Sequence, residues 1–238
     1  MSIATEITRL QTAKADLKTA IEGKGVTVPS ATKIDGYADL VDAIETGGGG
    51  GESNLAKLCN GTLTRLDDDG ILSVNSQLLR SLSTSLTTVF LKNLKSINQS
   101  YAFGCSALVT AVFPSIEMTS NSGFFFSGAS NLTSVDLGQG FSTEPQGVRQ
   151  NMFNQASILS VVILRNTELV PLNGINAFAN TPFANGKTGG TLYVPSALIS
   201  SYQSATNWST ILGYANNSIE AIEGSQYENY YADGTPIT

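Results

Sequence analysis

A short pattern recurs along the chain, and it restricts the fold more than any other feature of the sequence. An apolar residue is followed three positions later by a valine, and two positions after that by a second apolar residue. Counted between their first positions, the copies in 86–164 are 23, 23 and 27 residues apart, and a degenerate copy follows them: Leu86/Val89/Leu91, Val109/Val112/Pro114, Leu132/Val135/Leu137, Leu159/Val162/Leu164 and Leu192/Val194. Repeats of this length are typical of stacked structural units.

Each copy predicts one short strand, because residues two apart in a strand point to the same face. The valine and the second apolar residue are expected to point inward. A phenylalanine precedes three copies by six residues, and a fourth begins a unit with a longer loop: Phe103, Phe126, Phe153 and Phe178. One unit cannot close a core alone, so stacked units must share one, with a phenylalanine filling each turn. The sequence therefore predicts a β-solenoid.

Residues 62–74 precede these copies and contain Asp69-Gly70 between two short apolar runs. An Asp-Gly pair between such runs is typical of a β-hairpin. We expect this hairpin to cover the first repeat.

The first 46 residues predict two amphipathic helices. The first helix has apolar residues with heptad spacing, and Gly23 and Gly25 are expected to end it: Ile3, Ile7, Leu10, Leu17 and Ile21. The second begins near Thr32 and places its apolar residues on one face: Ile34, Tyr37, Leu40, Val41 and Ile44. Two helices of this length cannot bury both faces by themselves.

A run of glycines then separates these helices from the repeats. The stretch 47–53 has the composition of a flexible tether, so the helices must bury their apolar faces without the repeats. Docking of the helices on the repeats is the alternative. We favour self-association, with a trimer as one form, or docking onto a larger assembly. The predicted segments are a helical anchor at 1–46, the linker at 47–53, the repeat domain at 54–223 and a polar aromatic tail at 224–238.

The repeats resemble a known family. Residues 103–108 and 126–137 are similar to BspA-type leucine-rich repeats, which are found in bacterial surface proteins and in phage proteins. Residues 192–195 and 202–211 resemble the closing segment of such arrays, which implies that Pro195 begins a helix and that Tyr202 and Trp208 seal the last turn. The N-terminal piece resembles the opening of phage fibre or tail proteins. The resemblance implies an α+β fold: a short N-terminal helical module, a glycine linker and a leucine-rich-repeat-like β-solenoid with a C-terminal helix cap.

The residues that carry chemistry do not form a catalytic constellation. The chain has no histidine, which excludes Ser-His-Asp and Cys-His machinery. Lys187-Thr188 lacks the first glycine of a phosphate-binding loop. Carboxylates fall in different segments, without the pairing of a glycosidase: Glu117, Asp136, Glu144 and Glu168. We therefore expect no enzymatic activity and no cofactor.

Metal sites and nucleic acid are also disfavoured. Asp67–Asp69 lacks the spacing of a calcium loop and fits a turn, and Cys59 and Cys105 fit buried thiols better than zinc ligands. Thirteen Lys and Arg against nineteen Asp and Glu give a formal net charge of −6, and the basic residues are scattered. A nucleic-acid interface needs a basic patch. We expect no metal and no nucleic-acid partner.

The residue between the two inward positions of each repeat is expected to point outward. These residues form a mostly apolar stripe: Phe90, Phe113, Asp136, Ile163 and Tyr193. Exposed apolar patches mark interfaces. The stripe is therefore a candidate surface for another subunit or a receptor. Coverage by the chain's own loops or by its C-terminal segment is an equal alternative.

These features favour a non-enzymatic phage virion protein, a head fibre or a tail or baseplate fibre. Its N-terminal helices would hold it to itself and to capsid or tail proteins, and its repeats would bind a bacterial surface glycan or protein or decorate the particle. No signal peptide and no membrane span is evident, so we expect synthesis in the host cytoplasm and a place on the virion surface. A bacterial cell-surface adhesin is the alternative.

Overall fold

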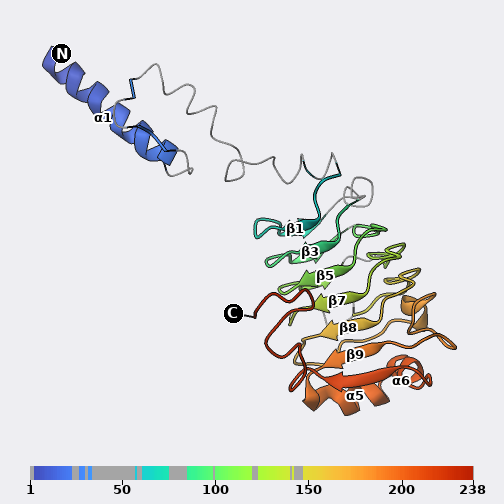
Figure 1. The fold of residues 1–238 in the computed structure, drawn as a ribbon. Helices are drawn as coiled ribbons and strands as arrows, with labels where there is room; N and C mark the ends of the chain where they lie inside the picture. Colours follow the sequence, from blue (N-terminus) through green and yellow to red (C-terminus); the bar gives the residue numbers. More distant parts are fainter. Residues whose placement is uncertain are drawn as a thin grey trace. The chain divides into compact units, whose positions relative to one another are not determined.

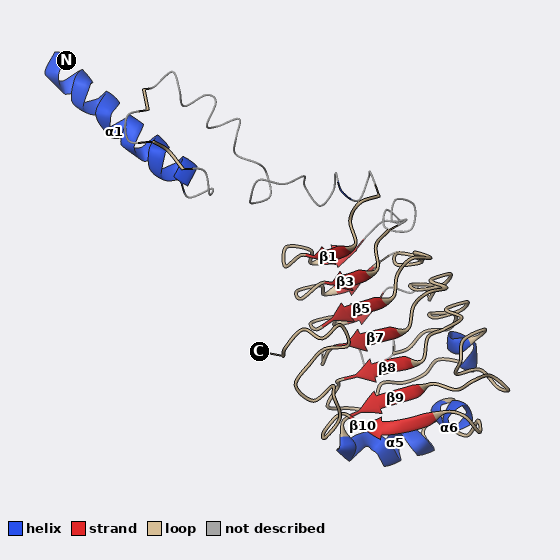
Figure 2. Ribbon diagram, viewed as in Figure 1, coloured by secondary structure: helices blue, strands red, loops and turns tan. Residues whose placement is uncertain are grey.

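The computed structural model describes residues 3–22, 27–29, 32–33, 57, 61–74, 85–98, 100–119, 123–139, 141 and 147–237. The chain divides into two compact units, residues 1–56 and 57–238. An N-terminal helix belongs to the first unit, and the second contains a mostly parallel sheet with a few short helices (Figures 1 and 2). These elements confirm the α+β class.

Helix α1 (Ile3–Glu22) is the regular element described in the first unit. Glu6 lies in its first turn, where a carboxylate interacts favourably with the helix dipole, and it pairs with Arg9 one turn later. Near the other end, the Lys18 ammonium donates a 3.3 Å hydrogen bond to the carbonyl of Val28, and Val28 is buried. The segment 27–29 therefore lies against the end of the helix.

The predicted second helix cannot be compared with the structure. Thr32 and Lys33 are described, and the backbone N–H and hydroxyl of Thr32 both donate to the carbonyl of Pro29, at 3.0 and 2.8 Å. Its apolar positions, together with the linker at 47–53, lie outside the described residues: Ile34, Tyr37, Leu40, Val41 and Ile44.

The second unit is built on a seven-stranded parallel sheet in which spatial neighbours follow one another along the chain. In spatial order, the strands are β1 (Arg65–Asp67), β3 (Thr88–Phe90), β5 (Thr110–Phe113), β7 (Ser134–Leu137), β8 (Val161–Leu164), β9 (Thr191–Val194) and β10 (Ser218–Ala221). Parallel neighbours require the chain to return to the same end of the sheet between strands. Each strand therefore opens a new turn of the chain, and Figure 1 shows the strands as a single row.

The first three turns also form a second, smaller sheet. It contains β2 (Ser73–Val74), β4 (Ser96–Ile97) and β6 (Met118–Thr119), all parallel. The hairpin predicted around Asp69-Gly70 is therefore wrong, because β1 and β2 belong to different sheets. The Asp68 carboxylate does accept a 2.7 Å hydrogen bond from the N–H of Gly70. The acidic run thus lies at a turn, but this turn leads the chain from one sheet to the other.

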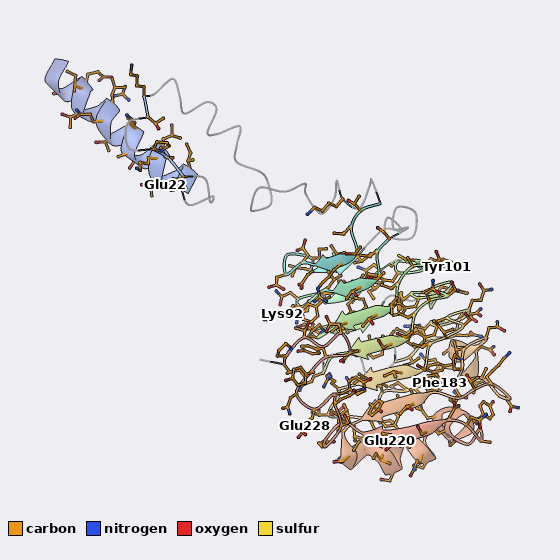
Figure 3. The ribbon with its side chains drawn as sticks, viewed as in Figure 1. Glu22, Lys92, Tyr101, Phe183, Glu220 and Glu228 are labelled. Carbon is orange, nitrogen blue, oxygen red and sulfur yellow. The ribbon has the colours of Figure 1, made fainter. Side chains whose placement is uncertain are left out.

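The inward rows of the large sheet form the core. One row aligns across all seven strands: Leu66, Val89, Ala111, Val135, Val162, Leu192 and Ile219. A second buried row lies two residues later on five turns: Leu91, Phe113, Leu137, Leu164 and Val194. Burying one such side chain stabilises the fold by roughly 1.5–3 kcal/mol. Side chains fill the space between strands and turns (Figure 3).

The second copy of the repeat starts one residue earlier than the sequence suggests. Ala111 pairs with Val89 and Val135, so Leu108, Ala111 and Phe113 take the inward positions. The earlier alignment on Val109, Val112 and Pro114 is wrong. A one-residue shift exchanges the two faces of a strand, and the run 108–113 is apolar enough to fit both registers. The larger Phe113 ring decides in favour of the core.

The phenylalanines that precede the strands stack on one another inside the turns. Ring centroids lie 5.7 Å apart from Phe103 to Phe126, 5.5 Å from Phe126 to Phe153 and 5.1 Å from Phe153 to Phe178. Phe178 ends the short helix η2 (Ile175–Phe178). These offset ring contacts add to the stabilisation from burial and fix the spacing of successive turns.

Short helices close the far end of the core. After Pro195 come η3 (Ser196–Leu198), α5 (Ile199–Ser204) and α6 (Trp208–Leu212). Tyr202 and Trp208 are fully buried, and both form hydrogen bonds with the backbone of Val170. The hydroxyl of Tyr202 accepts from the N–H of Val170 at 3.1 Å, and the indole N–H of Trp208 donates to the carbonyl of Val170 at 2.8 Å. Strand β10 follows these helices and adds a seventh strand that the repeat pattern does not predict.

Candidate functional site

The outward row of the large sheet differs at one position from the predicted stripe. Pairing across the strands aligns Asp67, Phe90, Val112, Asp136, Ile163, Tyr193 and Glu220. Phe113 is absent from this row. Its ring lies in the core, with its centroid 4.9 Å from that of Phe103 and 6.0 Å from that of Phe126. Val112 takes the outward place because of the register shift described above.

The middle of this row is covered. Phe90 is 6% exposed, Asp136 1%, and Val112 and Ile163 are fully buried, while Tyr193 is half-buried. The cover is the C-terminal segment 224–237, which we call the strap. Figure 1 shows it in dark red, returning from the β10 end along the row of strands. Of the two interpretations of the stripe left open by the sequence, the structure supports coverage by the chain's own C-terminal segment.

A buried ion pair holds the strap at the centre of the sheet. Arg165, which follows β8, donates from Nε and Nη2 to the two carboxylate oxygens of Asp136, each at 2.8 Å. Its remaining nitrogen Nη1 donates to the carbonyl of Tyr227 at 2.9 Å, and Nη2 also donates to the carbonyl of Tyr230 at 2.9 Å. The Asp136 carboxylate also accepts from the N–H of Ala232 at 3.1 Å.

Burial is the largest influence on the pKa of Asp136. Removal from water raises the pKa of Asp136 above its ordinary value, and the hydrogen bonds from Arg165 oppose this shift. A buried carboxylate with a bidentate guanidinium partner is an ion pair whose members depend strongly on each other. The pair therefore acts as a structural clamp on the strap.

Both ends of the strap have side-chain partners on the sheet. Near β10, the ring of Tyr227 packs edge-on against Tyr193, with centroids 4.7 Å apart. Near β1, Tyr231 packs edge-on against Phe90 at 5.6 Å. The buried carboxylate of Asp233 accepts a 2.8 Å hydrogen bond from Arg65. The strap thus joins the first strand of the sheet to the last, across 168 residues of sequence from Arg65 to Asp233.

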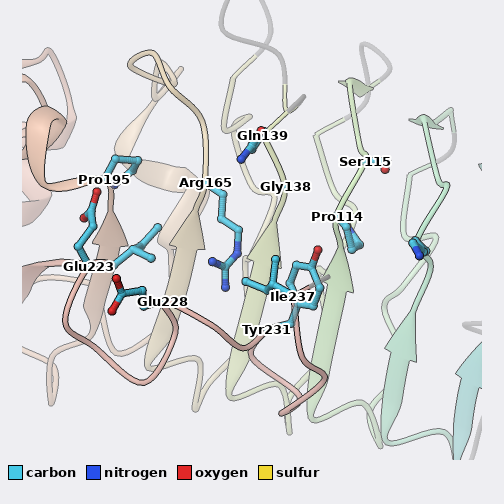
Figure 4. A pocket seen from close by; sticks show the side chains of 12 residues that line it. Pro114, Ser115, Gly138, Gln139, Arg165, Pro195, Glu223, Glu228, Tyr231 and Ile237 are labelled. Atoms are coloured by element: carbon cyan, nitrogen blue, oxygen red, sulfur yellow. The ribbon is translucent and has the colours of Figure 1, made fainter.

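A groove of about 480 Å³ lies between the strap and the ends of the strands (Figure 4). Charged groups of both signs line it, including Lys92 on one side and Glu223 and Glu228 on another. Both carboxylates are already engaged locally, since Glu223 accepts from the N–H of Ser196 and Glu228 accepts from that of Gly224. With both carboxylates bonded to backbone N–H groups, the groove fits a crevice left by the docked strap.

The loop around Lys187 forms a second shallow depression. Gly186 and Gly189 have φ values of +72° and +92°, and the Lys187 side chain is exposed. The carbonyl of Lys187 accepts from the Asn216 amide at 2.7 Å, which ties the loop to the following turn. Among the described residues, no three His, Cys, Asp or Glu side chains gather as a metal site.

The predicted anchor residues divide into three groups. Ile7, Leu10 and Leu17 on α1 are 51%, 46% and 41% exposed, respectively. Ile21 is buried instead, near the segment that contains Val28. Ile3 begins the helix, but its side chain is outside the described part of the chain, as are the five positions of the predicted second helix.

Comparison of the chain with models of protein families, with curated proteins and with solved structures gives no match. Within the described ranges, no helix has the length and apolar character needed to cross a membrane. The site is therefore interpreted from its own geometry. The sequence leaves coverage of the stripe by the C-terminal segment as one alternative, without the residues that hold the segment in place. The Asp233-Gly234 turn and the oppositely charged Arg165 and Asp136 are the signals that could have pointed to these contacts.

Proposed function

We propose that this chain is a non-enzymatic structural protein of a phage virion, a head fibre or a tail or baseplate fibre. In this proposal, α1 attaches the chain to its own copies and to capsid or tail proteins. The second unit, a leucine-rich-repeat-like solenoid, is displayed outward as a decoration or as a contact to the bacterial surface.

The exposed apolar face of α1 is the observation that carries the proposal. Ile7, Leu10 and Leu17 lie at spacings of three and seven, which places them on one side of a helix. A surface helix whose large aliphatic side chains are about half exposed gains free energy when a partner covers them, since each buried CH₂ contributes about 0.8 kcal/mol. The partner in this proposal is the same helix of other copies.

The second unit supports a display role rather than catalysis. Its successive parallel strands, stacked Phe rings and strand-to-strand spacing of about 22–30 residues fit a leucine-rich-repeat-like solenoid. Its inward rows are buried and the centre of its outward row is covered by the strap. Such a unit folds as a stable body and leaves its other surfaces for recognition.

The experiment that tests this proposal determines where the chain is found after infection. Particles from a culture that carries this gene are purified through a density gradient, and peptides of the chain are quantified by mass spectrometry relative to the major capsid protein. A constant copy number per particle across gradient fractions is expected. Recovery of the chain in the bacterial envelope fraction, with none in the particles, would overturn the proposal and favour a cell-surface adhesin.

A further inference from the structure

The strap contains its own small hairpin. The N–H of Tyr231 donates to the carbonyl of Thr235 at 2.8 Å, and that of Ile237 donates to Asn229 at 3.0 Å. Between them the chain turns at Gly234, with φ at +84°, and the Asp233 carboxylate accepts from the N–H and the hydroxyl of Thr235. Residues 229–237 therefore hold their shape largely by internal hydrogen bonds.

The strap docks on the sheet without joining it as a strand. Among the described residues, no backbone–backbone hydrogen bond links residues 224–237 to strands β1 to β10. At the centre, Arg165 and Asp136 bond to the strap's main chain at Tyr227, Tyr230 and Ala232. Because these contacts are made to main-chain atoms, they depend on the backbone shape of the strap rather than on its side chains.

Side chains on either side of this centre add a sequence requirement. Tyr227 packs on Tyr193, and with Ile163 and Ile222 it forms a separate apolar cluster on the outer face. Asp233 provides the carboxylate that Arg65 binds. A fitting ligand therefore has two aromatic residues four positions apart and an acidic residue two positions after the second.

The strap begins at a hydrogen-bonded turn. Gly224 adopts a φ of +79°. The N–H and hydroxyl of Ser225 donate to the carbonyl of Ile222 at 3.1 and 2.7 Å, and the N–H of Gly224 donates to Glu228 at 3.1 Å. Lifting the strap therefore breaks a few local hydrogen bonds, and the wide φ range of glycine lets the chain continue in a new direction.

We propose that the outer face of the sheet is a binding site for the strap as a ligand, and that neighbouring copies of the chain exchange their straps through it. A tethered strap competes at an effective concentration in the millimolar range, which excludes dilute unrelated peptides. In an assembly held together by α1, as proposed above, the strap of an adjacent copy is tethered to the same assembly and can make the same contacts. Exchange links copies through their second units and goes beyond the proposed role of α1.

The first test asks whether the face binds the strap in trans. A full chain with Tyr227→Ser, Tyr231→Ser and Asp233→Asn has a weakened strap, and Tyr230→Ser is the control because that ring is half exposed. A fluorescent peptide of residues 224–238 should bind the weakened chain saturably at 1:1. It should bind wild type and the control at least tenfold more weakly, and adding Asp136→Asn with Arg165→Gln should remove the binding.

Hydrogen exchange of residues 225–237 accompanies this measurement. The weakened chain should lose protection there and keep it in β7 and β8. The proposal is overturned if the strap of the weakened chain stays protected from exchange. It is also overturned if the peptide does not bind a weakened chain whose sheet stays protected, or if the peptide binds wild type equally well. If the triple substitution unfolds the sheet, the single Asp233→Asn chain is used with the same criteria.

The second test asks whether copies exchange straps. The weakened chain retains an intact face, and the Asp136→Asn, Arg165→Gln chain retains an intact strap. Their mixture should form a 1:1 complex by light scattering, beyond any association that each shows alone. If the mixture contains only the species that each chain forms alone, strap exchange between copies is contradicted, even if the peptide binds.

Discussion

Arg165 and Asp136 form two parallel 2.8 Å hydrogen bonds beneath the strap, and their side chains are 10% and 1% exposed, respectively. The guanidinium lies 5.2 Å from the ring centroid of Tyr231. Asp136 comes from β7 and Arg165 from the end of β8, so the pair joins two successive turns and the strap. All three segments would lose contacts if the pair broke.

Replacing one member of this ion pair should destabilise the fold more, per substitution, than replacing both. Arg165→Gln leaves a buried carboxylate without its partner, and a loss of about 3–5 kcal/mol in the free energy of unfolding is expected. Asp136→Asn should cost a similar amount. The double substitution should cost clearly less than the sum, because neither charge remains, and urea unfolding of the four chains measures the coupling. Strict additivity would contradict a coupled pair.

Gly138 should not tolerate a side chain. A Cβ there would lie 1.6 Å from the carbonyl oxygen of Pro114 in the preceding turn, so Gly138→Ala must push two turns apart. A loss of about 1–3 kcal/mol in unfolding free energy is expected. Gly174→Ala is the matched control, because its backbone is extended and no atom lies within 4 Å of the added carbon. Equal stabilities of the two variants would show that the turns are not in close contact.

The two phenylalanines assigned to the outward stripe should behave differently. Phe113 packs between Phe103 and Phe126 in the core, so Phe113→Ser should cost about 3–5 kcal/mol or more. Phe90 contacts the strap through Tyr231, so Phe90→Ser should cost less, about 1.5–3 kcal/mol, and should release hydrogen-exchange protection in the strap. Strap release by Phe113→Ser without loss of core protection would contradict this assignment.

Much of the strand arrangement of the second unit could be predicted because several copies of the repeat independently indicate the same strand positions. The cassettes at Leu86, Leu132 and Leu159 fix strand spacing, and the phenylalanine offset fixes what fills each turn. The copy at 108–113 failed because its consecutive apolar residues allow two registers, and a strand pattern cannot choose between them. The register is determined only by pairing with the neighbouring strands β3 and β7.

The covered face was harder to predict for a different reason. Whether Ile163 and Tyr193 face water depends on a segment far along the chain, and local periodicity carries no information about such contacts. Asp136 within an apolar row was an informative exception, since a buried carboxylate needs a partner. That partner, Arg165, lies 29 residues later, beyond any local pattern.

Tyr202 should make the fold sensitive to alkaline pH. Burial raises its pKa from 10.0 to about 12, with the hydrogen bond from Val170 opposing the shift. As the pH rises, the Tyr202 hydroxyl therefore ionises first in the unfolded chain. The stability that the neutral hydroxyl contributes is present in full below pH 10 and is lost as the pH rises through about 12. Two pKa units correspond to about 2.7 kcal/mol.

The measurement compares wild type with Tyr202→Phe. At pH 7 the variant should be less stable, by about 1–3 kcal/mol, because the N–H of Val170 loses its partner. Between pH 10 and 12 its stability should fall less steeply than that of wild type in urea unfolding. Parallel pH profiles would indicate that the Tyr202 hydroxyl ionises as readily in the folded protein as in the unfolded chain.

Self-association through α1 is the central claim, and its most direct test is the mass of the full chain in solution by light scattering. A multiple of the monomer mass is expected for wild type and for the control chain with Gln11→Ser, Thr12→Ser and Thr19→Ser, which alters exposed polar positions of the same helix. The chain with Ile7→Ser, Leu10→Ser and Leu17→Ser should have a lower mass with an unchanged melting transition of the second unit. A monomeric wild type, or equal masses for all three chains, would contradict the account.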